Sequence, residues 1–258
     1  MHRILVATQA GSEPDSALRV ARAIAAREEA TLLQTACVHD CRAARAIAAE
    51  GEQRAVDLIA LGCEQVEPGD GASCGEIALE VARWSHVPVL ALAPGSTGLP
   101  HTVVAATDFS PSSVNAARTA LALLDDTGTL SLVHVCPDVE LPRDALCNWK
   151  ARYAHFAGKL LARTVHEMGA DRSARVTPLQ LAGNPAQEIM AFAARVNADL
   201  IAAGNHSYHV VERLLVGRVA AQLLRTAHCS VLLAPSSASV PQRELARRAE
   251  CAAVPGVV

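Results

Sequence analysis

The chain has 258 residues, of which 51% are hydrophobic, 3% aromatic and 19% charged, and its formal net charge at pH 7 is -3. This composition excludes a disordered or collagen-like chain, and the charge provides no basic face of the kind that nucleic-acid binding requires. Charged residues interrupt the apolar segments every few positions, so no run reaches the roughly 18 residues that a membrane-spanning helix needs. We therefore expect no nucleic-acid or membrane partner, and the length leaves room for two small domains.

The first residues and the cysteines indicate the cellular compartment. Residues 1–3 lead directly into the apolar segment 4–8, which is too short for the core of a signal peptide. Eight cysteines in a chain of this length are also far fewer than a disulfide scaffold carries. We expect a cytoplasmic protein whose cysteines are thiols.

Two copies of one sequence pattern follow each other along the chain. Residues 4–9 match residues 103–108 at an offset of 99, and residues 57–62 match residues 199–204 at an offset of 142. The second offset is larger by 43 residues, so the first copy lacks a segment of that length. An internal repeat of this kind predicts two related folding units.

Each copy reads as short apolar strands that alternate with Ala-rich helical stretches, a pattern typical of parallel βαβ units. In the first copy, strands are expected at 4–8, ending near 37, at 58–61 and at 87–92, with a helix at 77–84. In the second copy, strands are expected at 102–107, 130–135, 175–181, 200–203 and 230–234, with helices at 113–124, 150–168, 185–196 and 219–226.

The predicted fold class is therefore α/β, with two tandem open parallel-sheet domains of which the first is abbreviated, because it lacks the long helix and the middle strand of the second. Pro, Gly and Ser residues between the copies are typical of a linker. We expect the abbreviated domain at 1–94, the linker at 95–100, the complete domain at 101–236 and a mobile tail at 237–258.

In an open parallel sheet, ligands bind beyond the carboxyl ends of the strands. In the second copy the residues at these ends include Asp108, Val135 and the segment 204–207, and Gly217 begins a predicted helix. Thirteen positions separate Gly204 from Gly217, and the same number separates Gly62 from Gly75 in the first copy.

At this point the chain resembles the universal stress protein family in its tandem two-domain form. The nucleotide motif of that family is Gly, two residues, Gly, nine residues, Gly, then Ser or Thr, and it corresponds here to Gly204, Ser207, Gly217 and Arg218. Three further segments resemble the family in the same order along the chain: 105–110, 183–189 and 227–233.

The resemblance implies a Rossmann-like, adenine-nucleotide-binding fold and an ATP-responsive regulatory protein of the stress response, with a magnesium-dependent ATP site in the second copy. In the family, the carboxylate that matches Asp108 contacts the adenosine portion, and the loop that starts at Gly204 surrounds the ribose and phosphates. Glycines let backbone amides approach phosphate oxygens, and a helix N-terminus favours anionic charge. The residues expected to bind the nucleotide are Ala106, Thr107, Asp108, Val135, Ala203, Gly204, His206, Ser207, Gly217, Arg218 and Val219.

Two residues of the second copy depart from the family's motif. Ser207 replaces the second glycine, and Arg218 replaces the hydroxyl residue. The guanidinium of Arg218 either holds phosphates more strongly than a hydroxyl or fills the pocket and pairs with a nearby carboxylate.

The first copy departs further from the motif and is expected to be a degenerate domain that does not bind ATP. Gln9 stands where the second copy has Asp108, and Gln65 and Glu76 occupy the second-glycine and hydroxyl positions. Further negative charge lies between Gly62 and Gly75, at Glu64, Glu67 and Asp70.

Two other functions stay open at the level of sequence. The chain could be a protein-interaction module whose pockets are relics of nucleotide binding. It could instead be a thiol or zinc sensor that uses the cysteines of the first copy, although their spacing matches no standard zinc module and buried cysteine behaves as a small hydrophobe. The residues of this second alternative are Cys37, His39, Cys41, Cys63 and Cys74.

No hydrolase, metalloprotease or P-loop motif is present in the sequence, so dedicated catalysis is not expected, and slow ATP hydrolysis stays open. The edge strands 88–92 and 230–233 are expected to pair the two domains within one chain, because a free sheet edge favours pairing. We also expect a homodimer, and the identity of a protein partner stays open.

Overall fold

The computed structural model describes residues 1–9, 16–37, 41–62, 74–136, 143–169, 175–205 and 216–236. The predicted tail at 237–258 lies outside these residues. In the described part of the chain, no helix is both long and apolar enough to cross a membrane.

The first half alternates strands and helices from the N-terminus to the linker. Its elements are β1 (Arg3–Gln9), α1 (Ser16–Glu28), β2 (Thr31–Cys37), α2 (Cys41–Gln53), β3 (Leu58–Gly62), α3 (Cys74–Trp84) and β4 (Val89–Leu92).

The second half repeats this alternation over a longer stretch of chain. Its elements are β5 (Thr102–Ala106), α4 (Pro111–Leu123), β6 (Thr129–Cys136), α5 (Arg143–Glu167), β7 (Val176–Ala182), α7 (Pro185–Arg195), β8 (Leu200–Gly204), α8 (Arg218–Thr226) and β9 (Ser230–Ala234).

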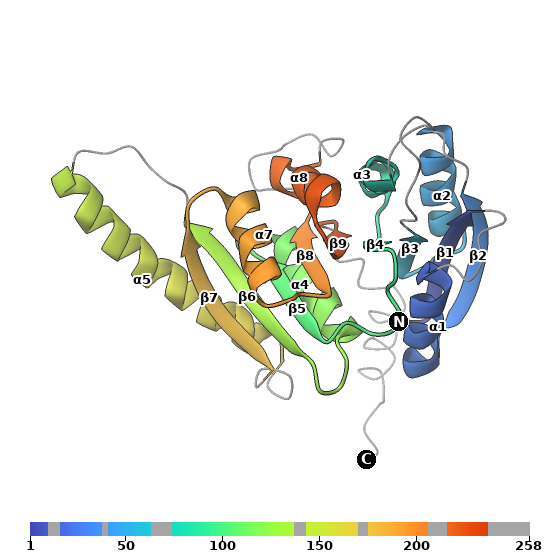
Figure 1. Cartoon of the computed structure of the whole chain (residues 1–258), viewed down its shortest axis with the longest axis horizontal. Helices are drawn as coiled ribbons and strands as arrows, with labels where there is room; N and C mark the ends of the chain where they lie inside the picture. Colours follow the sequence, from blue (N-terminus) through green and yellow to red (C-terminus); the bar gives the residue numbers. More distant parts are fainter. Residues whose placement is uncertain are drawn as a thin grey trace, which may run out of the picture.

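The nine strands in the described part of the chain belong to one sheet, in the order β2-β1-β3-β4-β9-β8-β5-β6-β7 (Figure 1). Neighbouring strands are parallel within each half, which confirms the predicted α/β class. The two halves meet where β4 pairs antiparallel with β9, with Leu90 opposite Leu232. The edge strands that were predicted to pair within one chain therefore do so, and they convert two open sheets into one.

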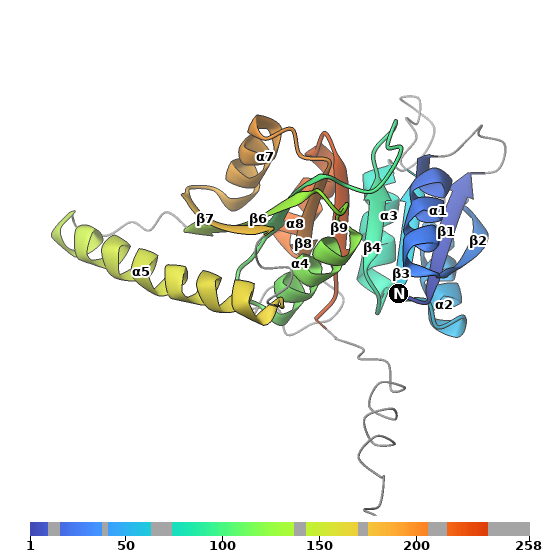
Figure 2. The same ribbon diagram turned by 90° about the horizontal axis from the view of Figure 1, so that it is seen from below.

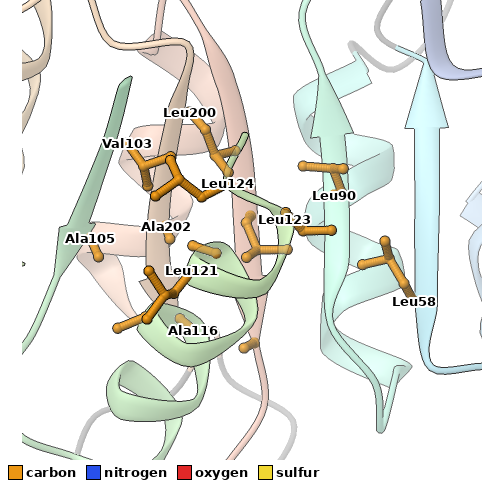
Figure 3. Close-up of a cluster of buried hydrophobic side chains, with 14 of the residues drawn as sticks. Leu58, Leu90, Val103, Ala105, Ala116, Leu121, Leu123, Leu124, Leu200 and Ala202 are labelled. Atoms are coloured by element: carbon orange, nitrogen blue, oxygen red, sulfur yellow. The ribbon is translucent and has the colours of Figure 1, made fainter. Parts of the chain in front are cut away.

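The sheet separates two layers of helices, and each layer spans both halves (Figures 1 and 2). The side chains of α1, α4 and α5 pack on one face, and those of α2, α3, α7 and α8 pack on the other. Successive residues of each strand alternate between the two faces, so that Leu90 belongs to the first core and its neighbour Val89 to the second. Figure 3 shows Leu90 and Leu58 of the first half close to Leu123 of the second half.

Matching hydrogen bonds hold the amino ends of the two halves. The Oδ2 atom of Asp57 accepts from the backbone amides of His2 at 2.5 Å and Arg3 at 3.0 Å. The Oδ2 atom of Asp199 accepts from the amides of His101 and Thr102, both at 2.9 Å. Each aspartate thus ties the start of its own strand to the start of the neighbouring strand.

The halves also contact each other through a charged side chain. The guanidinium of Arg27, at the end of α1, donates to the carbonyl oxygens of Ala122, Leu123 and Leu124 at the C-terminus of α4. These carbonyls have no partner within their own helix, and a cation near a helix C-terminus is favoured by the helix dipole. Arg27 therefore fastens the first half to the second on the face opposite α3 and α8.

The structure corrects several predicted element boundaries. Helix α4 begins at Pro111 rather than at 113, because Ser110 caps it and proline is well suited to its first turn. Strand β4 begins at Val89 rather than at 87, since Pro88 has no amide hydrogen to offer a ladder. Helix α5 begins at Arg143 rather than at 150, and its N-terminal end extends beyond the sheet (Figures 1 and 2).

The sequence pattern gave no residue range for two helices of the first half, α1 and α2. Helix α2 directly precedes β3 in the first half, just as α7 directly precedes β8 in the second. Only α5 and β7 have no counterpart among the elements that the structure describes in the first half, as the offset of the repeat predicted.

We expect the two halves to unfold together, because each core contains residues from both. Leu90 is 2% exposed and packs in the core shown in Figure 3, so Leu90→Ala should lower the free energy of unfolding by about 2 to 5 kcal/mol. Urea unfolding followed by circular dichroism measures this change. The matched control is Phe156→Ala, because Phe156 is 61% exposed and its truncation should cost little. Separate transitions for the two halves, with Leu90→Ala affecting only one, would contradict the shared core.

Candidate functional site

A cavity of about 510 Å³ lies at the carboxyl ends of β5, β6 and β8, next to the first residues of α7 and α8. Its volume is in the usual range of small-molecule sites. The position is also the one at which open parallel sheets bind their ligands. Its lining residues are Ala106, Thr107, Asp108, Ser113, Val133, His134, Val135, Pro185, Ile189, Ala203, Gly204, Val216, Gly217, Arg218, Val219 and Ala220.

Every candidate binding residue that the structure describes lies in this lining. Two candidates, His206 and Ser207, lie outside the described residues. The remaining lining residues were not among the candidates from the sequence, and two of them, His134 and Ser113, are polar. His134 could have been noticed as a polar residue in an otherwise apolar strand, directly before Val135.

One wall of the cavity is apolar and buried. Val135 of β6, Ala203 of β8 and Ile189 of α7 are each at most 7% exposed. Side chains of this kind offer hydrophobic contact to a flat ring and no charge to a phosphate.

Asp108 follows β5 in a tightly bonded turn. Its Oδ1 atom accepts from the amide of Ser110 at 3.0 Å, and the amide of Phe109 donates to Thr107 Oγ1 at 3.0 Å. Phe109 has a φ of 64°, which is uncommon for a residue with a β-carbon. The side chain of Asp108 is exposed to the cavity, and no described residue donates to its second oxygen, Oδ2. This carboxylate is thus held through one oxygen and can accept a ligand hydrogen bond through the other.

His134 connects this turn to α5. Its Nδ1 atom lies 2.8 Å from the carbonyl oxygen of Thr107, and its Nε2 atom lies 2.8 Å from the hydroxyl of Tyr153. Because a carbonyl only accepts, Nδ1 carries the hydrogen, and Nε2 accepts from the tyrosine hydroxyl. Burial, and to a lesser degree Cys136, raises the pKa of Tyr153, so this hydroxyl stays protonated at neutral pH.

The N-terminus of α8 opens into the cavity without a capping side chain. Its N-cap residue, Gly217, makes no side-chain hydrogen bond. By contrast, the hydroxyl of Ser110 accepts from the amide of Ser113 in α4, and Asn184 accepts from the amide of Gln187 in α7. The first amides of a helix need acceptors and favour an anion. The start of α8 is therefore the one N-terminus, among the helices whose caps are described, that could offer its amides to a ligand.

The two glycines of the motif have different structural roles. A β-carbon at Gly204 would lie 2.5 Å from Ser112 Oγ and 2.7 Å from the amide nitrogen of Ser113, so Gly204 is required by the close approach of β8 to α4. Among the described residues beyond its chain neighbours, a β-carbon at Gly217 would come no closer than 3.7 Å to any atom, and the φ of Gly217 is -59°. Packing against the described residues thus explains Gly204 but not Gly217.

Arg218 is exposed at the rim of the cavity. It forms no ion pair with a carboxylate in the part of the chain that the structure describes. From the sequence, this guanidinium either fills the pocket or remains available to hold phosphates. Its exposed position favours the second of these interpretations.

The first half places an acidic residue at the corresponding helix start. Glu76 lies exposed in the first turn of α3. Gln65 and the acidic residues Glu64, Glu67 and Asp70 lie outside the described residues, as does the side chain of Gln9.

The sensor interpretation receives no support from the described residues. They contain no group of three or more His, Cys, Asp and Glu side chains that could hold a metal ion. The cysteine side chains on which that interpretation rests, and His39, lie outside the described part. Burial raises the pKa of Cys229, a free thiol, to about 11, so it stays protonated at neutral pH.

A second cavity, of about 460 Å³, lies beneath the linker at the amino edge of the sheet. Its lining includes Asp199, but that carboxylate already accepts two backbone hydrogen bonds. Among the described residues, the lining of this second cavity contains no arginine or lysine, whereas that of the first contains Arg218.

Comparison with known sequences gives one family and one curated relative. The model of the universal stress protein family matches residues 100–235, more than half of the chain. Universal stress protein MJ0531 of Methanocaldococcus jannaschii is 30% identical over 135 residues, which cover 51% of this chain and 79% of that protein.

Solved structures with a similar fold cover nearly the whole chain. Protein PA1789 of Pseudomonas aeruginosa, whose function is unknown, has a TM-score of 0.57 and 18% identity, covering 97% of this chain and 86% of its own. A universal stress protein of Archaeoglobus fulgidus has a TM-score of 0.54 and 18% identity, covering 92% and 88%. These likenesses support the α/β fold of both halves together.

The different roles of the two glycines can be tested by stability measurements. Gly204→Ala should lower the free energy of unfolding by about 1 to 3 kcal/mol, because the added methyl group overlaps α4. Gly217→Ser, the matched control, should change it little, since serine is at least as good an N-cap as glycine. Thermal unfolding of both variants measures the difference. Equal stability of Gly204→Ala and the wild-type protein would show that the approach of β8 to α4 imposes no constraint.

Proposed function

Because the chain belongs to the universal stress protein family, we propose that it is an ATP-responsive regulatory protein of the stress response. Its ATP site is the cavity at the carboxyl ends of β5, β6 and β8. The observation that carries the proposal is the uncapped N-terminus of α8 beside a cavity that has one apolar wall.

The cavity divides into two regions whose chemistry matches the two ends of an adenine nucleotide. Val135, Ile189 and Ala203 form the apolar wall, which suits the adenine ring. Gly217, Arg218 and Val219 provide backbone amides and one guanidinium, which suit the phosphates. Asp108 lies in the same lining, and its unoccupied oxygen suits a hydroxyl or amino donor of the adenosine portion.

The charges that line the cavity also suit magnesium-bound ATP. No described carboxylate pairs with Arg218, so the phosphates supply the negative charge that this guanidinium lacks. A magnesium ion held by the phosphates would neutralise part of their charge beside Asp108. Binding of ATP, rather than dedicated catalysis, is the activity that we assign to this site.

We propose that the first half does not bind ATP. Glu76 stands at the position in α3 that Arg218 occupies in α8, so a phosphate at the first helix would meet a negative charge where the second offers a positive one. Repulsion of this kind opposes phosphate binding.

Removal of the Asp108 carboxylate tests the site. Isothermal titration of the nucleotide-free wild-type chain with ATP and magnesium should show one saturable site per chain. Asp108→Ala should weaken binding at least tenfold, because a buried ligand donor would lose its acceptor. Asp126→Ala removes an exposed carboxylate outside the cavity and should bind like the wild-type protein. Equal affinity of Asp108→Ala and Asp126→Ala would contradict the proposed site.

An artificial cap on α8 tests the phosphate end separately. Gly217→Asp supplies a carboxylate that accepts from the first amides of α8 and repels phosphate. We expect unchanged or slightly higher stability together with at least tenfold weaker ATP binding. Gly217→Ser should fall between this variant and the wild-type protein. Unchanged affinity in Gly217→Asp, measured by the same titration, would show that phosphates do not bind at this helix.

A further inference from the structure

Asn205 lies between the cavity and the first half of the molecule. It follows Gly204 directly at the end of β8, and it is 2% exposed. Its main chain makes two hydrogen bonds within the second half. The amide donates to Ala234 at 2.9 Å, and the carbonyl oxygen accepts from the amide of Gly217 at 2.7 Å. Asn205 therefore holds in place Gly217, the N-cap residue of α8, beside the cavity.

The side chain of Asn205 reaches into the other half. Its Nδ2 atom donates to the carbonyl oxygen of Ala82 at 3.2 Å, and both atoms are buried. Ala82 belongs to the last turn of α3, whose C-terminal carbonyls need donors from outside the helix. A single residue thus contacts the start of α8 through its backbone and the end of α3 through its side chain.

Stability alone does not account for an asparagine at this position. The Oδ1 atom of Asn205 is buried and has no hydrogen-bond partner among the described residues. Buried polar atoms are usually paired, and an unpaired acceptor is unfavourable. The hydrogen bond between the halves therefore leaves a second polar atom of the same side chain unpaired within the described part of the chain, which packing does not explain.

A second close contact joins α3 and α8, this time between the start of α3 and the end of α8. A β-carbon at Gly75, in the first turn of α3, would collide with the carbonyl oxygen of Leu224 in α8. At the offset of 142, Gly75 corresponds to Gly217, and Ala82 corresponds to Leu224. The last turn of each helix is thus contacted by the region of the glycine motif in the other half.

The relation between the halves is nevertheless unequal. At the same offset, the first half has Cys63 where the second half has Asn205. A thiol is a much weaker hydrogen-bond donor than an amide. The half with the candidate nucleotide cavity therefore has the carboxamide that binds across the junction, and the degenerate half does not.

We propose that Asn205 is a positioning residue that couples occupancy of the nucleotide cavity to α3 of the first half. The coupling rests on the proposed function, because it requires a phosphate at the N-terminus of α8. A phosphate that binds the amides at Gly217 and beyond fixes Gly217, and with it Asn205 and the hydrogen bond to Ala82. By thermodynamic linkage, the intact contact with α3 must in turn strengthen nucleotide binding. The first half is then part of the response to the nucleotide and not only a scaffold.

Hydrogen exchange of the full-length chain, with and without ATP and magnesium, tests the coupling. In the wild-type protein, ATP should slow amide exchange in the last turn of α3, at Val81 and Ala82, and at Ser85, whose amide donates to the carbonyl oxygen of Val81. In Asn205→Ala this protection should be lost, and the dissociation constant for ATP should rise about five- to tenfold, within the usual range of coupling between sites.

The matched control is Ser230→Ala, which removes a different hydrogen bond between the halves. Ser230 Oγ accepts from the amide of Ala93 at 3.1 Å, at the amino edge of the sheet and away from the nucleotide cavity. This variant should keep both the wild-type affinity for ATP and the protection of α3. A merely structural role for Asn205 would make the two variants behave alike.

Two results overturn the proposal in distinguishable ways. If the wild-type protein binds ATP and exchange in α3 is unchanged, the coupling is wrong and the proposed function stands. If the wild-type protein binds no ATP, both are wrong. The wild-type exchange measurement decides the matter even if Asn205→Ala does not fold.

Discussion

The antiparallel pairing of β4 with β9 is the constraint on which the rest of the molecule depends. Both strands are buried on both faces, and each would be an exposed edge if the halves were apart. Their pairing brings α3 against α8 on one face of the sheet. On the other face it brings α1 to α4, where Arg27 binds the carbonyls at the end of α4.

The candidate site lies in the second half, but part of it is held in place by the junction with the first half. The end of the cavity that we propose for the phosphates is the start of α8, and α8 packs against α3 of the first half. The end that we propose for the adenosine portion depends on the second half alone, through the turn after β5 and the contact from His134 to Thr107. The two ends of the cavity are thus supported by different parts of the chain. The first half therefore supports one end of a cavity that lies in the second.

Much of the fold could be predicted from the sequence, because each central strand is a continuous apolar run and the repeat gave the order of the elements. The candidate residues could be predicted for a related reason. Asp108 comes shortly after β5 and Gly204 ends β8, and the carboxyl ends of these two parallel strands lie at the same edge of the sheet. Helix α2 was missed because no motif marks it. His134 and Asn205 were missed because their importance lies in partners distant in the sequence, Tyr153 and Ala82. The packing role of Gly204 could not be predicted either, since only the structure shows its contact with α4.

The most direct test of the account is a map of the ATP site by amide chemical shifts of the isotope-labelled, full-length chain. Titration with ATP and magnesium should move the amides of Gly217, Arg218, Val219 and Ala220 most, together with those of Thr107 and Asp108. The corresponding first-half amides at the start of α3 should move little. Saturable shifts confined to the linker cavity at the amino edge, or no shifts at all, would contradict the claim that the start of α8 binds the nucleotide.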